Sequence, residues 1–315
     1  MNISVVIPLY NKEEYVYTAI SSVLNQTVQP AEIVVVDDGS TDNSVNEVMK
    51  IKDARIHLKR QLNSGVSMAR NRGVLEAQYD LVAFLDADDE WKPDFLFHIQ
   101  RLYNNFPDCG AYATAYEISE EDGSRGFPRL AEIPPAPWIG IIPNLFKLMQ
   151  DGLPFLPSSV AMPKTVFQHL KGFPEGIKQG EDKILWTCLG MAYPIAYSPS
   201  YQVVYHKEPI NRACRTFEPE PAAANFIEGM LKNQGAPPAL SQDLKDYYAS
   251  LIIQKAQLSV KEGYTQWARH LLGRIKQNRK YRAQWTWWYI WSFVPYSFTK
   301  NVLRILSVIK RNSNS

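Results

Sequence analysis

Short apolar runs alternate with longer mixed segments through the first hundred residues, and this alternation limits the fold more than any other feature of the chain. The apolar runs lie at residues 3–7, 32–36, 55–58 and 81–85, and helical segments fall near 12–25, 41–51 and 66–77. Residues 33–36 and 81–85 are apolar without interruption, which indicates strands that are covered on both faces. The pattern predicts an α/β fold in which helices flank a parallel sheet.

The rest of the chain has a different texture. Ten prolines fall between residues 104 and 180, and they argue against long helices there. The elements expected beyond it are a helix at 182–191, a short strand near 202–205 and helices after 220, with a break at 235–238 and a long segment at 241–273. We therefore expect an α/β domain at residues 1–215 and a mainly helical C-terminal region at 216–315.

Composition excludes several classes of protein. The net charge of +2 argues against a surface that binds nucleic acid, because such surfaces need a clear cationic excess. Three cysteines, Cys109, Cys188 and Cys214, show no pairing pattern or metal-ligand spacing, so we expect reduced thiols and no zinc site. Residues 1–8 lack the basic start of a secretory signal, and no apolar run is long enough to span a membrane. These features predict a cytoplasmic protein.

Polar side chains follow three of the predicted strands, at the edge where an open parallel sheet binds its ligands. The first strand runs into Pro8 and Tyr10, the second into Asp37 and Asp38, and the fourth into residues 86–89. Because the carboxyl ends of neighbouring parallel strands share one edge, we expect these groups to line one crevice.

Asp86 and Asp88 stand two residues apart, so an extended backbone can project both side chains to the same side. Two such carboxylates can hold Mg²⁺ or Mn²⁺, which take oxygen ligands and complete their shell with water and substrate phosphates. The alternative is a solvated acidic turn, which is also the simplest interpretation of Asp89 and Glu90. If the side chains of Asp86 and Asp88 point apart, or face a lysine or arginine that already satisfies them, an enzyme assignment that depends on this metal loses its foundation.

Five stretches occur in one order: "SVVIPLYN", "IVVVDDGSTD", "NSGVSMARNRG", "FLDADDEWKPD" and "GEDKILW". Together they resemble the family 2 glycosyltransferases, enzymes with the nucleotide-sugar-binding GT-A fold. The resemblance covers roughly residues 3–210. It implies a GT-A type sheet flanked by helices, to which the helical C-terminal region would be an extension.

The resemblance also implies roles for individual residues toward the donor nucleotide. Asp38 is expected to bind the base with the help of Asp37, and residues of the first loop are expected close by, namely Pro8, Tyr10 and Glu13. Asp86 is expected to face the ribose and the metal, and Asp88 to be the direct metal ligand. Arg70 and Asn71 match an element that lies near the nucleotide, although a salt-bridged arginine is an equally simple interpretation.

Asp182 matches the aspartate of the family's ED motif, which acts as the catalytic base. At the start of a helix the dipole would keep Asp182 ionised, while the charge of Glu181 would oppose this. The alternative is that Asp182 only caps its helix and that Glu181 is solvated. His206 follows a predicted strand and is a candidate third contact to the metal or diphosphate, with a purely structural histidine as the alternative.

These residues imply an inverting, metal-dependent glycosyltransferase of hexosyltransferase type, which uses Mn²⁺ or Mg²⁺ and a nucleotide sugar, with a UDP-sugar favoured. Its acceptor would be a saccharide or a lipid-linked molecule in the synthesis of cell-surface polysaccharide or glycan. One alternative is a catalytically inert protein of the same fold that binds carbohydrate or lipid surfaces. Another is a nucleotidyltransferase, but "PLYNKEEY" lacks the glycine-rich loop of that class, and also the glycines that dinucleotide-binding oxidoreductases need.

Residues 285–311 combine clustered tryptophans with a basic amphipathic segment. Interfacial aromatic residues beside such a segment are typical of an anchor on a membrane surface. This would place the protein peripherally on the inner face of the plasma membrane. The alternative is a helix that packs on its own domain or on a partner chain.

Overall fold

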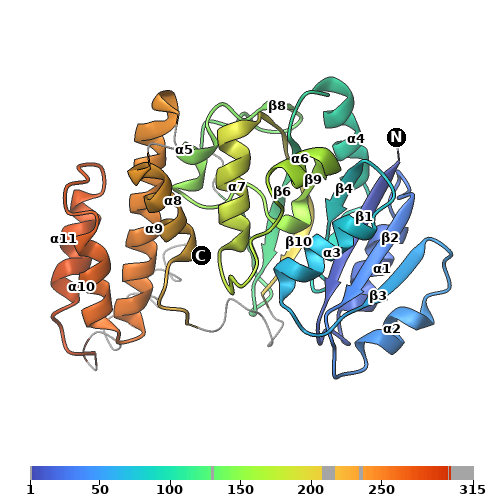
Figure 1. Ribbon diagram of the computed structural model, residues 1–315, viewed down its shortest axis with the longest axis horizontal. Coiled ribbons are helices and arrows are strands. Elements are labelled where there is room, and N and C mark those ends of the chain that lie inside the picture. Colours follow the sequence, from blue (N-terminus) through green and yellow to red (C-terminus); the bar gives the residue numbers. More distant parts are fainter. Residues whose placement is uncertain (1, 129–130, 208–216, 234–236, 297, 299–315) are drawn as a thin grey trace. The chain divides into compact units, whose positions relative to one another are not determined.

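A mixed sheet organises the first of two compact units in the computed structural model, which describes residues 2–128, 131–207, 217–233, 237–296 and 298 (Figure 1). The units are Met1–Thr216 and Phe217–Ser315. The strands are β1 (Ile3–Leu9), β2 (Glu32–Asp37), β3 (Ile56–Arg60), β4 (Leu81–Phe84), β5 (Glu90–Trp91), β6 (Ala111–Ser119), β7 (Arg125–Gly126), β8 (Gly140–Ile141), β9 (Val160–Pro163) and β10 (Ile195–His206).

Strand order in the sheet is β3-β2-β1-β4-β9-β6-β10-β5, with β7 paired to β6 and β8 paired to β10. The pairs among β3, β2, β1 and β4 are parallel, as are β6 and β10, whereas β9, β5, β7 and β8 pair antiparallel. The expectation of a parallel sheet is therefore correct for the first four strands, and the remainder makes the sheet mixed. The carboxyl ends of β2, β1 and β4 lie at one edge.

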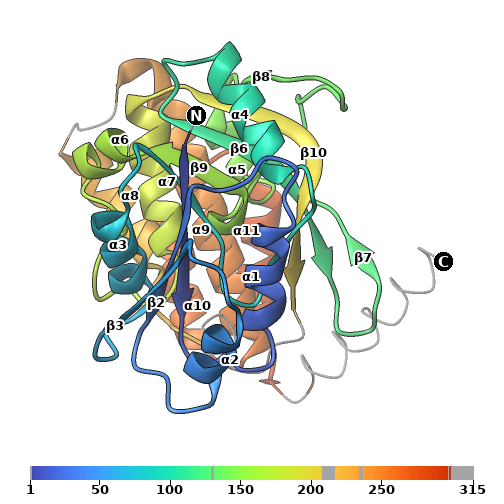
Figure 2. The ribbon, with the colours of Figure 1, turned by 90° about the vertical axis from the view of Figure 1, so that its right-hand side faces the viewer.

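Helices cover both faces of this sheet. They are α1 (Val16–Leu24), α2 (Ser44–Lys50), α3 (Val66–Glu76), α4 (Phe95–Asn105), α5 (Leu145–Met149), α6 (Lys164–His169) and α7 (Glu181–Ala192), with a short 3-10 turn, η1, at Pro157–Ser159. Figure 2 shows α1 and α3 on opposite sides of the strands. This arrangement explains why residues 33–36 and 81–85 carry no polar alternation, since each side of these strands is buried.

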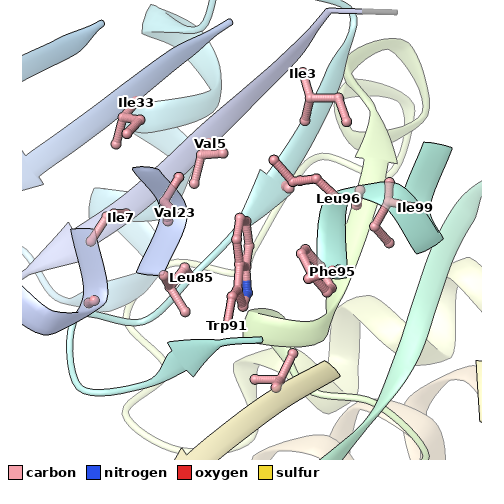
Figure 3. Close-up of a cluster of buried hydrophobic side chains, with 14 of the residues drawn as sticks. Ile3, Val5, Ile7, Val23, Ile33, Leu85, Trp91, Phe95, Leu96 and Ile99 are labelled. Atoms are coloured by element: carbon pink, nitrogen blue, oxygen red, sulfur yellow. The ribbon is translucent and has the colours of Figure 1, made fainter. Parts of the chain in front are cut away.

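Alternate residues of the central strands enter two different packing layers. Ile3, Val5 and Ile7 pack with α1 and α4 in one hydrophobic cluster, which includes Trp91 and Phe95 (Figure 3). On the opposite face the ring of Phe84 lies 5.7 Å from that of Phe167 in α6 and 5.6 Å from that of Phe173. Because side chains alternate along a strand, neighbouring residues of one strand contact helices on opposite faces of the sheet.

Four strands, β6 to β9, lie in the proline-containing region 104–180, where the sequence predicted no strand. β6 is a nine-residue strand without proline, and β9 ends at Pro163. β10 starts earlier than the predicted strand, and its register with β6 shifts between Ser198 and Tyr201, next to Pro199. A proline has no amide hydrogen to donate to the neighbouring strand, so β10 accommodates Pro199 through this shift in register.

The second unit is helical, as the sequence predicts. It contains α8 (Ala222–Lys232), the 3-10 turn η3 (Pro238–Leu240), α9 (Ser241–Lys261), α10 (Thr265–Gly273) and α11 (Arg282–Trp291). α9 contacts α8, α10 and α11. The expected long segment at 241–273 divides because Gly263 takes a φ of 86°, which ends α9 before α10 begins.

Some sequence predictions fall outside the described residues, namely Cys214 and, within the amphipathic C-terminal segment, residues 297 and 299–311. Cys109 and Cys188 are free thiols. Within the described part of the chain, no helix combines the length and the apolar content needed to cross a bilayer.

Candidate active site

The loops that follow β1 and β2 are joined by hydrogen bonds. The amide of Asn11 donates to Ser40 Oγ at 3.1 Å, and the amide of Thr41 donates to Asn11 Oδ1 at 2.8 Å. The amide of Asn43 donates to Glu13 Oε2 at 2.7 Å. These bonds fix the two loops relative to each other at the carboxyl edge of the sheet.

The three first-loop residues predicted to approach the nucleotide therefore differ in position. Pro8 is buried within β1, where it pairs in register with Val36. Tyr10 is 45% exposed, and Glu13 is exposed with its carboxylate on the Asn43 amide. The ring of Tyr10 is thus open to a ligand, whereas Pro8 is covered and the Glu13 carboxylate is already hydrogen-bonded. The nucleotide contacts of all three residues stay predictions.

Asp37 and Asp38 are both buried and both shape the loops around them. Asp37 accepts a hydrogen bond from the Ser40 amide at 3.0 Å and one from Arg60 Nε at 3.2 Å. Asp38 Oδ1 accepts from Gln61 Nε2 and from the Ser64 amide, and its Oδ2 accepts from the Gly65 amide at 2.8 Å. An ionised carboxylate can accept about four hydrogen bonds, so Asp38 keeps one acceptor position beyond these three.

Gly39 is required between these aspartates and α2. Its φ is 78°, in the left-handed region that residues with a Cβ atom seldom adopt. A Cβ atom there would also lie 2.9 Å from the backbone nitrogen of Asn63. The glycine of the "DDGS" stretch therefore permits the close approach of the loop that Asp38 holds.

Arg70, in the first half of α3, bridges the loop after β4 and the start of α7. Its Nη2 donates to both oxygens of Asp86, at 2.7 and 2.9 Å, and its Nη1 donates to Glu181 Oε1 at 3.0 Å. The guanidinium group also lies over the ring of Phe173, 4.9 Å from its centroid. Arg70 is thus salt-bridged, and its side chain is only 4% exposed. Its expected contact to a nucleotide stays a prediction.

The buried bridge shifts the ionisation of its members. Burial alone would lower the pKa of Arg70, but the charges and hydrogen bonds of Asp86 and Glu181 outweigh it and raise that pKa. Burial and then the charge of Asp182 raise the pKa of Glu181, against the opposing effect of Arg70. The alternative in which Glu181 is solvated is wrong, because its side chain is largely buried against Arg70.

Asp88 is paired with a lysine. Lys12 Nζ lies 2.7 Å from Asp88 Oδ2, and the two side chains are 11% and 14% exposed. Both motif aspartates therefore face a cation of the protein, so the argument from unpaired charge at Asp86 and Asp88 fails. Their role as metal ligands stays a prediction and needs other support.

Lys12, described above, and Asp89 and Ser158 are site residues that sequence reasoning missed. Asp89 is buried and not a solvated turn residue: Ser158 Oγ donates to its Oδ2 at 2.5 Å, and the His206 amide donates to its Oδ1 at 3.3 Å. Burial, together with the charges of Asp88 and Asp86, raises the pKa of Asp89 well above its usual range. Ser158 Oγ also accepts from the Asp86 amide at 3.1 Å, so the turn η1 fixes the loop that carries the aspartates.

Asp182 is the second residue of α7, and the residue preceding that helix, Gly180, makes no side-chain cap. Asp182 Oδ1 accepts a hydrogen bond from the Lys183 amide at 2.7 Å. Burial and then the charge of Asp182 raise the pKa of Tyr116 to about 12. Asp182 is therefore half-buried in the first turn of α7, next in sequence to Glu181 of the Arg70 bridge.

Two further predicted residues make contacts of a structural kind. The side-chain amide of Asn71 donates to the Phe173 carbonyl and accepts from the Phe173 amide, at 2.8 and 2.9 Å. The His206 ring lies 3.8 Å from Glu90 Oε2. The nucleotide role of Asn71 and the metal role of His206 stay predictions.

Carboxylates outnumber the cationic side chains that pair with them at this edge. The acidic residues are Asp37, Asp38, Asp86, Asp88, Asp89, Glu181 and Asp182, and the cationic partners described above are Lys12, Arg60 and Arg70. Seven carboxyl groups thus stand against three cationic partners. A diphosphate would add negative charge at this edge, so a further cation would favour its binding.

The donor set fits a divalent ion held by two protein carboxylates. Asp86 and Asp88 supply the oxygen ligands that Mg²⁺ and Mn²⁺ accept, and phosphate and water commonly supply the others. Within the described ranges, no group of three or more His, Cys, Asp or Glu side chains is arranged to hold a metal alone. A metal at this edge would thus depend on the substrate for part of its shell.

Comparison with known proteins gives a family, several relatives and similar folds. The family model described as "Glycosyl transferase family 2" matches residues 4–169. An uncharacterized glycosyltransferase of Rickettsia bellii is 32% identical over 194 residues, which are 59% of this chain and 26% of that protein. The putative teichuronic acid biosynthesis glycosyltransferase TuaG of Bacillus subtilis is 37% identical over 125 residues, which are 39% of this chain and 49% of that protein.

Among solved structures, S. aureus TarS 1–349 in complex with UDP-GlcNAc superposes with a TM-score of 0.64 and 19% identity. The match covers 90% of this chain and 78% of that one. At this identity the likeness concerns the fold, and it confirms the predicted GT-A type sheet flanked by helices with a helical C-terminal extension. The chain covers only 26% to 30% of the length of relatives from Rickettsia bellii, Rickettsia felis and Rickettsia conorii.

Proposed function

The chain belongs to glycosyl transferase family 2, and from that premise we propose that it transfers a sugar from a nucleotide-sugar donor, a UDP-sugar in the first instance, to a saccharide or lipid-linked acceptor. The observation that carries the proposal is the Arg70 bridge. This bridge joins Asp86, in the loop after β4, to Glu181, the neighbour of Asp182. It connects the loop expected to hold the donor with the helix expected to carry the base.

In this proposal the reaction is a single displacement that inverts the anomeric carbon. Asp182 takes the proton of the acceptor hydroxyl while that oxygen bonds to the anomeric carbon, and the bond from this carbon to the diphosphate breaks with its electron pair on the diphosphate. Asp182 is half-buried in the first turn of α7, and its remaining exposure supports this role because it leaves a side on which an acceptor can approach.

The donor would lie along the edge formed by β2, β1 and β4. Asp38 offers its remaining acceptor position to the base, and Tyr10 offers an exposed ring beside it. Asp86 and Asp88 would hold Mn²⁺ or Mg²⁺, an ion that stabilises negative charge on the leaving diphosphate when bound. The excess of carboxylates at this edge supports the need for that ion.

Two finer parts of the proposal concern the pathway and the place of action. The teichuronic acid relative and the TarS fold favour synthesis of a cell-surface polysaccharide. α11 and the residues just after it favour a peripheral position on the inner face of the plasma membrane. In this segment Trp287, Ile290 and Phe293 are 53%, 59% and 63% exposed, and such apolar exposure suits a membrane interface.

The test of the proposed function is a thermal-shift screen of nucleotide sugars with and without Mn²⁺. A ligand that binds the native state raises the melting temperature, by an amount that grows with its concentration relative to Kd. We expect one UDP-sugar to raise it in the presence of Mn²⁺ and to do so much less without the ion. If no nucleotide sugar shifts the melting temperature and a nucleoside triphosphate does, the alternative nucleotidyltransferase function would be favoured.

A further inference from the structure

The formal charge of the chain is divided unevenly between its two units. The unit Phe217–Ser315 carries 14 Lys and Arg against 6 Asp and Glu, a net charge of +8, whereas Met1–Thr216 carries 20 against 26, a net charge of −6. Four of the 14 cations, at positions 300, 304, 310 and 311, lie outside the described residues. The net charge of +2 for the whole chain therefore conceals a clear cationic excess in the second unit, and such an excess attracts anionic partners.

A basic turn, residues 274–282, joins α10 to α11 and is attached to α9. The side-chain amide of Asn278 donates to Asp246 Oδ1 in α9 at 3.1 Å, and Asn278 Oδ1 accepts from the Tyr281 amide at 3.2 Å. Ile275 of the same turn is buried. The basic side chains of the turn therefore project from a backbone that the fold holds in place.

These basic side chains differ in whether an acidic group neutralises them. Arg274 points to the protein and forms a salt bridge with Glu228. Lys276, Arg279 and Arg282 are exposed, and none of them forms a salt bridge with an acidic side chain in the described ranges. Three positive charges of the turn are thus available to an external anion.

The cations adjoin the exposed apolar residues of α11. Arg282, Thr286 and Ile290 follow one another at intervals of four residues and are all exposed, so they lie along one face of that helix. At its far end the guanidinium group of Arg269 lies 4.6 Å from the ring centroid of Phe293, which is 63% exposed. A soluble polyanion would satisfy the cations but leave the apolar side chains in water, whereas a membrane surface with anionic headgroups satisfies both.

We propose that Lys276, Arg279 and Arg282 bind the phosphate groups of anionic phospholipids, while Ile290 and Phe293 enter the apolar boundary of the same membrane surface. This inference rests on the peripheral position included in the proposed function, and it adds the class of lipid that the second unit selects. Electrostatic attraction of this kind adds to apolar burial and is screened by salt.

The test is sedimentation with vesicles of phosphatidylcholine alone and of phosphatidylcholine mixed with phosphatidylglycerol. The wild type should bind the anionic vesicles more tightly. Each Lys or Arg at an anionic surface strengthens binding about five-fold, so the triple variant Lys276→Gln, Arg279→Gln and Arg282→Gln should bind them about 100-fold more weakly. Its binding to neutral vesicles should stay as in the wild type. About 1 M salt, which shortens the screening length to about 3 Å, should remove most of the difference.

Two control variants separate a local surface from net charge. Lys50→Gln, Lys52→Gln and Arg101→Gln remove three exposed positive charges from the first unit, and this variant should bind anionic vesicles as the wild type does.

The variant Lys276→Arg, Arg279→Lys and Arg282→Lys keeps the charges of the turn and should also bind as the wild type does. Thermal unfolding verifies that each variant is folded. The rise in melting temperature with a UDP-sugar and Mn²⁺ reports the donor site independently of lipid.

The outcomes distinguish the inference from the function on which it rests. Equal binding of the triple variant and the wild type to anionic vesicles would show that the headgroup contact is wrong. Equal binding of the wild type to neutral and anionic vesicles would also overturn it, while the peripheral position through α11 would stand.

Two further results would overturn more than the headgroup contact. If the wild type binds soluble polyphosphate but no vesicle, the partner is a polyanion and not a lipid. If it binds neither, both the surface and the peripheral position are wrong, and a UDP-sugar that still raises the melting temperature would leave the proposed sugar transfer intact.

Discussion

Four carboxyl groups at the carboxyl edge, those of Asp86, Asp88, Asp89 and Glu181, have four different electrostatic environments. Asp86 accepts two hydrogen bonds from one guanidinium nitrogen, and Asp88 accepts one from an ammonium group. Burial raises the pKa of Asp89 and of Glu181, but only Glu181 has an arginine that opposes the shift. The chemistry available to each group is therefore set by its partner and its burial, and less by its place in a motif.

Asp182→Asn tests the assignment of the catalytic base. The amide cannot take a proton from the acceptor, so turnover should fall by about 10²–10⁴-fold or more. Donor affinity should change little, because the proposed donor contacts come from other residues. Steady-state kinetics and calorimetry with the same nucleotide sugar measure the two quantities. Full activity in the variant would show that another group is the base.

Glu181→Gln tests the electrostatics of the buried bridge through pH. The pKa of Glu181 is higher in the folded protein than in the unfolded chain, so its contribution to stability is complete below pH about 4.5 and is lost as pH rises through the folded pKa. The wild type should thus lose free energy of unfolding relative to the variant as the pH rises above about 4.5. Urea unfolding at pH values on both sides of this point measures the difference, and a constant difference would contradict the raised pKa.

At the residue scale, the sequence located the acidic positions but not their partners. Asp38, Asp86 and Asp88 could be found because each follows an apolar run that ends at the carboxyl edge. Lys12 lies 76 residues from Asp88, and Ser158 lies 69 residues from Asp89. Local spacing carries no information on such pairs, which depend on how loops meet in the folded chain.

At the scale of elements, the packing of α3 on β1 also depends on a contact that local sequence spacing does not reveal. A Cβ atom at Gly73 would lie 2.2 Å from Val6 Cγ1, and Val6 is buried in the centre of the sheet. The valine cannot retreat without disturbing its neighbours. The glycine therefore lets the helix that carries Arg70 approach the strand closely.

Gly73→Ala should lower the free energy of unfolding by about 1–3 kcal/mol, the usual cost of overpacking a core. Gly229→Ala is the matched control, because a Cβ atom at this position in α8 would meet nothing within 4 Å. That substitution should raise stability by about 0.4–1 kcal/mol, through the lower entropy of the unfolded chain. Equal effects of the two substitutions in urea unfolding would contradict the close packing of α3.

Elements with a strong local pattern were predicted, and elements with long-range pairing were not. β1, β2 and β4 each contain a short apolar run, at residues 5–7, 33–36 and 81–84, so their strands could be predicted directly from the sequence. β6 and β9 pair with each other across more than forty residues, in a region where the prolines obscured the pattern. The break between α9 and α10 depends on one backbone conformation at Gly263, which composition alone does not specify.

At the scale of the whole molecule, the family match agrees with the observed fold, and the proposed sugar transfer would take place at the carboxyl edge of the sheet. The chain divides into the units Met1–Thr216 and Phe217–Ser315. That these are separate domains, one for transfer and one for attachment to a surface, stays a prediction. The exposed apolar residues of α11 give the second unit a property that can be measured.

Membrane attachment can be tested by sedimentation with vesicles that contain anionic lipid. The double variant Trp287→Ser and Ile290→Ser removes two exposed apolar side chains, and its binding should fall by about ten-fold or more. Leu75→Ser is the control, because Leu75 is 70% exposed on α3 and lies outside the proposed surface. Equal binding of the double variant and the wild type would favour a protein partner for α11.

The central claim is that Asp88 and a divalent ion hold the diphosphate of a nucleotide sugar at the carboxyl edge. Calorimetric titration of the wild type and of Asp88→Asn with a UDP-sugar, each with and without Mn²⁺, tests it most directly. We predict that Mn²⁺ strengthens binding to the wild type and has no such effect on the variant. Equal strengthening by Mn²⁺ in both proteins would contradict the claim.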